Sequence, residues 1–376
     1  MPSLYIGLMS GTSLDGVDGV LVDFVPSGPM PLRVRAHVHR AFAPAFADEL
    51  LALNACGQDE LHRAALAANA LARVYADVVQ DLLKRSAVSA AQVRAIGAHG
   101  QTVRHRPREF DGMGYTVQLN NPALLAEMSG ISVIADFRSR DIAAGGQGAP
   151  LVPAFHRAAF GRAGETVAVL NIGGISNLTA IAADGSVLGF DCGPGNALMD
   201  CWCQRHTGKP FDDQGGWAGS GKVLTLLLSA LQSEPYFKQP PPKSTGRDLF
   251  NPSWLESRLP SAQGASAAPP QDVQATLAEL TAWACAEAAQ RYASGARSVL
   301  VCGGGSFNTD LMQRLARRVG NMAVTSSDAA GLNANHVEAA AFAWLAKAFV
   351  ERQPGNLSSV TGAAGPRVLG ALYPSQ

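Results

Sequence analysis

Three glycine-rich turns are the first residues of this chain that could do chemistry. They span 11–16, 173–177 and 303–306, and an apolar segment precedes each of them. Turns built from Gly, Ser, Thr and Asn expose backbone N–H groups, and such groups can cradle phosphate oxygens. Tight hairpins use the same residue types, so one such turn alone is weak support. Three of them, spaced along one chain, predict a ligand that carries phosphate.

Asp191 is the carboxylate that we single out as a catalytic candidate. It follows an apolar segment and precedes Gly193-Pro194-Gly195-Asn196, which leads into a predicted helix. Ligands of α/β folds bind where strands end and helices begin, so the position suits acid–base work. Capping of the following helix explains the same pattern equally well. Glu338, in the first turn of the last predicted helix, could likewise serve a site or only favour the helix N-terminus.

Two polar segments could contact a substrate. His99 and Gln101 follow a short predicted strand, where they could donate to a sugar, although a structural histidine fits the position as well. Residues 138–141 hold two arginines and an aspartate just before the Gly-rich stretch 145–148. A solvated ion pair is the alternative interpretation of that segment.

Common nucleotide and hydrolase motifs are missing from the sequence. No G-x-x-x-x-G-K-[ST] string occurs, which argues against a P-loop enzyme. The stretch that begins at Gly193 has Leu198 where a dinucleotide fingerprint needs its third glycine. No serine lies in a G-x-S-x-G elbow.

The elements that must position these residues alternate between strands and helices, which predicts an α/β fold. An apolar strand, a turn and a return strand occur at the N-terminus and again near 167, so the chain suggests an internal repeat. A loop rich in Ala, Ser and Pro is expected at 259–270. Strands are predicted at 5–8, 17–24, 32–39, 93–98, 131–135, 167–170, 178–181, 186–190 and 299–301, and helices at 59–84, 122–130, 271–292, 308–318 and 336–350.

Size and charge narrow the class further. The 376 residues suit two domains, and 47% hydrophobic residues can build sizeable cores. Thirty basic and thirty acidic residues cancel, which argues against a nucleic-acid or membrane-surface binder. No apolar run has the length of a membrane span, and the N-terminus lacks a basic leader, so we expect a cytoplasmic protein. The six cysteines are scattered, which predicts reduced thiols rather than disulfides or a zinc site.

Several strings resemble the anhydro-N-acetylmuramic acid kinase family, in order from near residue 5 to near residue 345. Many members have Thr where this chain has Cys192, which leaves the neighbouring carboxylate and glycines intact. The matching strings lie at 6–18, 97–102, 136–138, 143–153, 171–177, 190–196 and 303–306.

The resemblance implies membership of the superfamily of sugar kinases, heat-shock chaperones and actin. Its fold is α/β, with two ribonuclease-H-like domains that flank an ATP-binding cleft. Domain I would comprise 1–135, with 346–376 packed back onto it, and domain II would comprise 136–345. The cofactors would be ATP and Mg²⁺, and the chain would form a homodimer. The implied nucleotide-binding residues are Gly11, Thr12, Ser13, Leu14, Asp15, Gly16, Val17, Asp18, Gly173, Gly174, Asn177, Gly193, Gly195, Asn196, Gly303, Gly304 and Gly305.

The resemblance also implies a reaction. Water adds to the anomeric carbon of 1,6-anhydro-N-acetylmuramic acid, the released 6-oxygen takes the γ-phosphoryl group of ATP, and the recycled cell-wall sugar leaves as its 6-phosphate. Asp191, with a near-normal pKa, would be the base for the water, and Glu338 would help to hold the water or the substrate. Asp15 or Asp18 would hold magnesium through waters. Arg138, or else Arg140, would grip the lactyl carboxylate. The implied substrate-binding residues are Arg138, His99, Gln101, Gly146, Gln147 and Pro150.

Two other functions share parts of this pattern. A non-catalytic ATPase module of the actin or chaperone kind would need the glycine-rich turns but not Asp191 together with Glu338. A kinase for another sugar would use an aspartate to take a proton from a hydroxyl group rather than from water. A product that retains the anhydro bridge would identify this second case.

Overall fold

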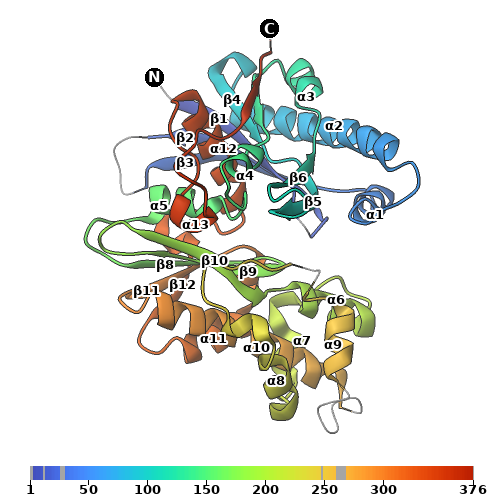
Figure 1. The fold of residues 1–376 in the computed structure, drawn as a ribbon, viewed down its shortest axis with the longest axis vertical. Helices are drawn as coiled ribbons and strands as arrows, with labels where there is room; N and C mark the ends of the chain where they lie inside the picture. Colours follow the sequence, from blue (N-terminus) through green and yellow to red (C-terminus); the bar gives the residue numbers. More distant parts are fainter. Residues whose placement is uncertain (1–2, 12, 26–29, 247–248, 260–267, 376) are drawn as a thin grey trace. The chain divides into compact units, whose positions relative to one another are not determined.

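The structure is a computed structural model that describes the chain except residues 1–2, 12, 26–29, 247–248, 260–267 and 376 (Figure 1). The chain forms two compact units, one of 1–159 with 336–376 and the other of 160–335. These boundaries differ from the predicted 135/136 and 345/346. Residues 136–159 stay with the first unit, and so does the helix that begins after His336.

The sheet of the first unit has the strand order β13-β7-β4-β1-β2-β3. Strands β1 to β3 form an antiparallel meander, and β4 and β7 continue the sheet parallel to β1. A short C-terminal strand pairs antiparallel with β7. The strands are β1 (Ser3–Met9), β2 (Gly16–Phe24), β3 (Leu32–Ala41), β4 (Val93–Ala98), β7 (Val133–Ala135) and β13 (Ala371–Tyr373), and a separate hairpin consists of β5 (Gln101–Pro107) and β6 (Gly114–Leu119).

The second unit repeats this topology. Its sheet has the order β10-β9-β8-β11-β12, with an antiparallel meander followed by two strands parallel to β8. A meander extended by parallel strands on the side of its first strand is the ribonuclease-H-like order, so the predicted fold class and internal repeat are confirmed. The strands are β8 (Val167–Ile172), β9 (Ile175–Ile181), β10 (Val187–Pro194), β11 (Ser298–Cys302) and β12 (Ala323–Ser326).

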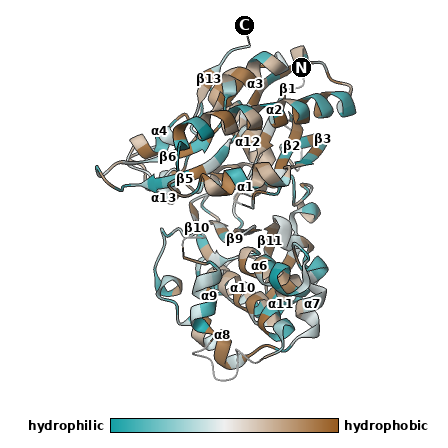
Figure 2. Cartoon of the chain, turned by 90° about the vertical axis from the view of Figure 1, so that its right-hand side faces the viewer, coloured by the Kyte–Doolittle hydropathy of each residue, from teal (hydrophilic) through white to brown (hydrophobic). Residues whose placement is uncertain are grey.

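Helices cover each sheet with an apolar face. In α2 (Glu60–Ser86) the buried Leu71, Tyr75, Val78 and Leu82 recur at steps of three and four, as the sequence pattern predicts. Figure 2 shows hydrophilic and hydrophobic residues mixed along this helix. Within the described residues, no helix combines the length and apolarity that a membrane span requires. The other helices are α1 (Pro44–Ala52), α3 (Pro122–Ser129), α4 (Ser139–Ala143), α5 (Val152–Phe160), α6 (Ala197–Thr207), α7 (Gly216–Ser220), α8 (Thr225–Gln232), α9 (Pro252–Arg258), α10 (Pro270–Tyr292), α11 (Thr309–Arg318), α12 (Val337–Val350) and α13 (Ser358–Thr361).

Helix α12 lies directly on the backbone of β1 and β4. A Cβ atom added to Gly7 would lie 1.8 Å from the Ala339 carbonyl oxygen, and one added to Gly97 would lie 2.0 Å from that of Phe342. Only glycine allows such an approach. These strand glycines therefore fix the position of the helix that carries Glu338.

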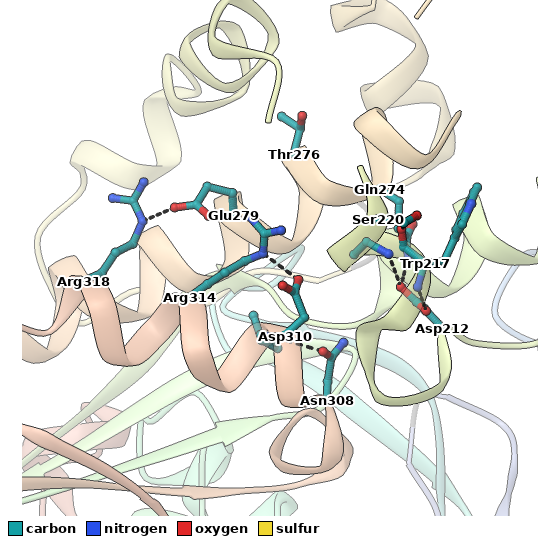
Figure 3. A network of polar contacts seen from close by, with 12 residues as sticks. Asp212, Trp217, Ser220, Gln274, Thr276, Glu279, Asn308, Asp310, Arg314 and Arg318 are labelled. Carbon is teal, nitrogen blue, oxygen red and sulfur yellow. Dashed lines mark hydrogen bonds and ion pairs between the residues drawn. The ribbon is translucent and has the colours of Figure 1, made fainter. Parts of the chain in front are cut away.

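A polar network fixes α11 against α10 in the second unit (Figure 3). Arg314 donates to Asp310 at 2.6 Å and to Glu279 of α10 at 2.7 Å, and Arg318 donates to the same glutamate. Nearby, Asp212 accepts from the backbone N–H groups of α7. Because α11 directly follows the glycine-rich loop at 303–306, this network also holds the end of that loop.

Candidate active site

Two glycine-rich segments of the second unit lie against each other. The N–H groups of Gly195 and Asn196 donate to the carbonyls of Gly174 and Gly173 at 2.9 and 2.8 Å. A Cβ at Gly195 would lie 2.2 Å from the Gly173 oxygen, so only glycine fits there. The β8–β9 turn and the segment that follows β10 therefore form one surface.

The loop after β11 joins the same surface. Gly303 has a φ of +77°, and a Cβ there would meet the Asn171 side-chain oxygen at 2.5 Å. A Cβ at Gly304 would lie 3.5 Å from Nδ2 of Asn196. The structure thus brings together the predicted residues at 173–177, 193–196 and 303–305, which are far apart in the sequence.

Asp191 lies within β10, in a row of polar residues that crosses the meander. It pairs with Asn177 of β9, which in turn pairs with Asn171 of β8. Paired residues on neighbouring strands share one face of a sheet. The N-cap position of helix α6 is Asn196, five residues after Asp191, and Oδ2 of Asp191 instead accepts a hydrogen bond from the N–H of Thr245 at 3.0 Å. The capping interpretation of Asp191 is therefore wrong.

The environment of Asp191 also changes its acidity. Burial raises the pKa of Asp191 to about 7, and the Thr245 N–H and the charge of Lys243 oppose this rise. The predicted near-normal pKa is wrong, because desolvation at this position cannot be seen in the sequence. A carboxylate with a pKa near 7 is well matched to proton transfer at neutral pH.

In the first unit, Arg138 is held between two acceptors. Its guanidinium donates to Nε2 of His99 at 2.9 Å and to the carbonyl of Gly148 at 2.7 Å. Nδ1 of His99 lies 3.2 Å from the Ser10 carbonyl, so the ring is neutral with its proton on Nδ1. Burial and the nearby Arg138 lower the pKa of His99 to about 3. Arg140 is exposed, which favours Arg138 as the residue for a bound carboxylate.

Glu338 belongs to the same group. It lies half-buried in the first turn of α12, and its charge raises the pKa of Arg138 against the larger, lowering effect of burial. The ring of His99 lies 4.7 Å from that of Phe342, one turn further along the helix. The structure therefore brings His99, Arg138 and Glu338 together.

Two amides beside this group carry polar atoms that lack partners in the described part of the chain. Nε2 of Gln101 donates to the Gly11 carbonyl at 3.1 Å, but its Oε1 is buried without a partner. Both polar atoms of the Asn120 side chain are also buried and unpartnered. Buried unpaired amides are costly in a resting protein and indicate a ligand site. The sequence did not identify Asn120 as a candidate site residue. Its neighbour Asn121 was predicted to cap α3, and the structure confirms this role.

Asp141 anchors the loop that holds Gly146, Gln147 and Pro150. It is fully buried and accepts from the Gly148 N–H at 2.8 Å, Nδ2 of Asn356 at 2.6 Å and the Thr361 hydroxyl at 2.8 Å. The predicted solvated ion pair at 138–141 is therefore wrong for Asp141. The loop instead depends on residues more than 200 positions further along the chain.

The first glycine-rich turn holds the two candidate magnesium ligands. Thr12 lies outside the described residues, whereas Leu14 turns the chain with a φ of +59° before Gly16 and Val17 enter β2. Oδ1 of Asp18 lies 2.9 Å from Nε2 of His37 and 3.2 Å from Nδ1 of His39. Asp15 is exposed and accepts from the Ser13 hydroxyl at 2.7 Å. Of the two carboxylates, Asp15 is the better fit to a hydrated cation, because Asp18 is already bound by two rings. Among the described residues, no group of three or more His, Cys, Asp or Glu side chains is arranged so that it could hold a metal ion.

A family model described as anhydro-N-acetylmuramic acid kinase matches residues 3–375. The chain belongs to this family. A relative from Variovorax paradoxus (strain S110), named anhydro-N-acetylmuramic acid kinase, is 62% identical over 99% of both chains. A second, from Albidiferax ferrireducens (strain ATCC BAA-621 / DSM 15236 / T118), has the same name and is 58% identical over the full length of both. The resemblance stated from the motifs is confirmed, and the chain is a member of a family of kinases.

One solved structure shares a distant likeness with this family member. The activator of the 2-hydroxyisocaproyl-CoA dehydratase from Clostridium difficile, with bound ADPNP, has a TM-score of 0.46 at 13% identity and covers 94% of this chain and 96% of its own. We draw no functional argument from that likeness.

Proposed function

We propose that this chain phosphorylates 1,6-anhydro-N-acetylmuramic acid at the 6-oxygen with ATP while water opens the anhydro bridge. The products are N-acetylmuramic acid 6-phosphate and ADP. Membership of the family over residues 3–375 is the observation that carries the proposal. The reaction belongs to the recycling of cell-wall sugar in the cytoplasm, and we propose that the enzyme is a homodimer.

Asp191 is the base in this reaction. It takes a proton from the water that attacks the anomeric carbon, and its raised pKa makes the ionised form a stronger base at neutral pH. The bond from the anomeric carbon to the bridging oxygen breaks, and the released 6-oxygen attacks the γ-phosphorus. Positive charge develops near the ring oxygen, as in glycoside cleavage. Glu338 helps to hold the water or the sugar.

The glycine-rich turns bind ATP. By the binding mode that the family resemblance implies, backbone N–H groups of the turns at 11–18 and 173–177 would bind the phosphates, and the loop at 303–305 would approach the adenosine. Phosphoryl transfer needs positioning and neutralisation of charge rather than covalent help. Mg²⁺, held through water by Asp15, would supply positive charge at the phosphate oxygens.

Arg138 binds the lactyl carboxylate of the sugar. A guanidinium grips a carboxylate with two parallel hydrogen bonds, and the contacts to His99 and Gly148 hold this one in place. Gln101, with its unpartnered oxygen, and the loop of Gly146, Gln147 and Pro150 contribute further contacts to the sugar.

The test is the mass of the product formed in oxygen-18 water. The purified protein, the anhydro sugar and Mg-ATP should yield a sugar phosphate that carries one heavy oxygen at the anomeric centre, and Asp191→Asn should lose nearly all activity. A phosphorylated sugar that retains its bridge would disprove the role of Asp191 towards water. Consumption of ATP without a sugar product would disprove the proposed substrate.

A further inference from the structure

The chain segment from Tyr236 to Thr245 lies against the edge strand that carries Asp191. The N–H of Asp191 donates to the Lys243 carbonyl at 3.2 Å, and the Thr245 N–H donates back to the Asp191 carboxylate at 3.0 Å. The Tyr236 hydroxyl donates to the Asp191 carbonyl at 2.7 Å. Both the backbone and the side chain of Asp191 are therefore held by this one segment.

The side chain of Lys243 is itself fixed within the segment. Its Nζ donates to the Tyr236 carbonyl at 3.2 Å and lies over two rings, 4.6 Å from the centre of Tyr236 and 5.8 Å from that of Phe190. Aromatic faces attract a cation, and the contact is stronger where water is partly excluded. The ammonium group is thus kept beside the strand instead of extending into solvent.

Other charged and titratable groups face Lys243 from α10 and from β10. Glu287 and Arg291 of α10 line, together with Lys243 and Cys192, a cavity of about 80 Å³. Burial lowers the pKa of Lys243, as does Arg291 to a smaller extent, while Cys192 and Asp191 raise it. The charge of Lys243 in turn lowers the pKa of Asp191.

We propose that Lys243 is a positioning residue for Asp191: it holds the segment that binds the carboxylate and supplies a positive charge that favours the ionised form of this base. The inference rests on the proposed function, in which Asp191 acts on the water. Without the ammonium group, Asp191 would take up a proton at higher pH, and the enzyme would have less of its active form at pH 7.

The test compares pH profiles of kcat/KM for the anhydro sugar. Lys243→Met keeps an unbranched stem for the two rings but removes the charge, and should move the acid limb up by about one pH unit. Activity should fall several-fold at pH 6.5 and return towards the wild-type value at pH 9. Lys243→Arg, which keeps a cation, should restore most of the wild-type profile. Lys238→Met, an equal loss of charge at an exposed position of the same segment, should leave the limb in place.

A second measurement separates this inference from the proposed function. The carboxyl carbon of Asp191, labelled with ¹³C and assigned by its loss in Asp191→Asn, can be titrated without any substrate. A higher midpoint in Lys243→Met supports the inference even if the wild type forms no sugar phosphate, an outcome that would overturn only the proposed function. An unchanged midpoint, or an equal loss of activity at every pH in a well-folded Lys243→Met, would overturn the inference.

Discussion

Arg138 donates to Nε2 of His99, and that ring faces the Ser10 carbonyl through its other nitrogen. A protonated imidazole could not accept from a guanidinium, so this arrangement requires a neutral histidine. His99 therefore fixes the orientation of Arg138 without adding to the negative charge that Glu338 and Asp141 already place near it. A carboxylate partner in the place of His99 would have cancelled the charge that the proposed substrate needs.

The first prediction concerns the acid stability of the first unit. Burial lowers the pKa of His99 and His156 to about 3 and that of His105 to about 4. In the unfolded chain these three histidines take up protons near pH 6.5, whereas in the folded chain they stay neutral at that pH. The free energy of unfolding is therefore highest above pH 6.5 and falls as the pH drops below it. With all three titrating, the free energy of unfolding should drop by about 4 kcal/mol per pH unit at its steepest, near pH 5. Urea unfolding at pH 7.5, 6 and 5 measures this.

A matched pair of variants checks the origin of that slope. His156→Gln should reduce it by about one third, whereas His62→Gln, at an exposed position, should not change it. Equal slopes in the wild type and in His156→Gln would contradict the prediction.

The second prediction concerns the planar guanidinium group of Arg138 and its paired N–H donors. Lysine cannot span the His99 nitrogen and the Gly148 carbonyl and still present two donors to a carboxylate. Arg138→Lys should raise KM for the anhydro sugar about 10- to 100-fold, with a smaller change in KM for ATP. Steady-state kinetics with each substrate varied in turn measures both. A larger effect from Arg140→Lys would show that the wrong arginine is assigned.

The third prediction is that Asp191 costs stability. Its pKa of about 7 in the folded protein lies above the unfolded value, so ionisation destabilises the fold as pH rises from about 4 to 7. Asp191→Asn should therefore be inactive yet more stable than the wild type at pH 8, by about 1–3 kcal/mol. Thermal unfolding at pH 8 and pH 4 tests this, because the gain should vanish at the lower pH. A destabilised variant at pH 8 would mean that the carboxylate is favourable in the resting protein.

The fourth prediction concerns the unpaired amide of Asn120. Asn120→Leu, of similar volume, removes two buried polar atoms that lack partners within the described structure. The variant should be at least as stable as the wild type and should bind the anhydro sugar about 10-fold more weakly. Isothermal titration with the sugar, alongside urea unfolding, measures both. Unchanged affinity would show that Asn120 does not contact the substrate.

Local features of the fold were predictable from the sequence. The spacing of apolar residues predicts helix α2 to within a few residues of its observed bounds. Asn121 and Gly130 likewise predict where α3 begins and ends. The glycine-rich turns were also found, because short strands flank them. The hairpin β5–β6 and strand β13 were missed, since β5 is rich in Arg and His and β13 has only three residues.

The environment of the site could not be predicted in the same way. Thr245 and Lys243 reach Asp191 across more than 50 positions, and Asp141 reaches Thr361 across 220. Contacts between residues so far apart leave no local pattern in the sequence. For this reason both the predicted near-normal pKa of Asp191 and the predicted solvent exposure of Asp141 are wrong. Gly7 and Gly97 are a further sequence signal, because a glycine inside a strand often marks a close approach of another backbone. They indicate that another element packs directly on β1 and β4.

Helix α12 also sets the order in which the protein can mature on the ribosome. The backbone of β1 is complete after nine residues, but the helix that rests on Gly7 and Gly97 is not synthesised until residue 350. The second unit, 160–335, is one continuous stretch and is finished earlier. The first unit therefore cannot complete its fold until α12 has been synthesised, and until then its sheet is uncovered on the side that α12 packs against. The second unit can already fold during this time. Nascent chains stalled with residue 335 just outside the exit tunnel should resist protease in the second unit and remain sensitive in the first.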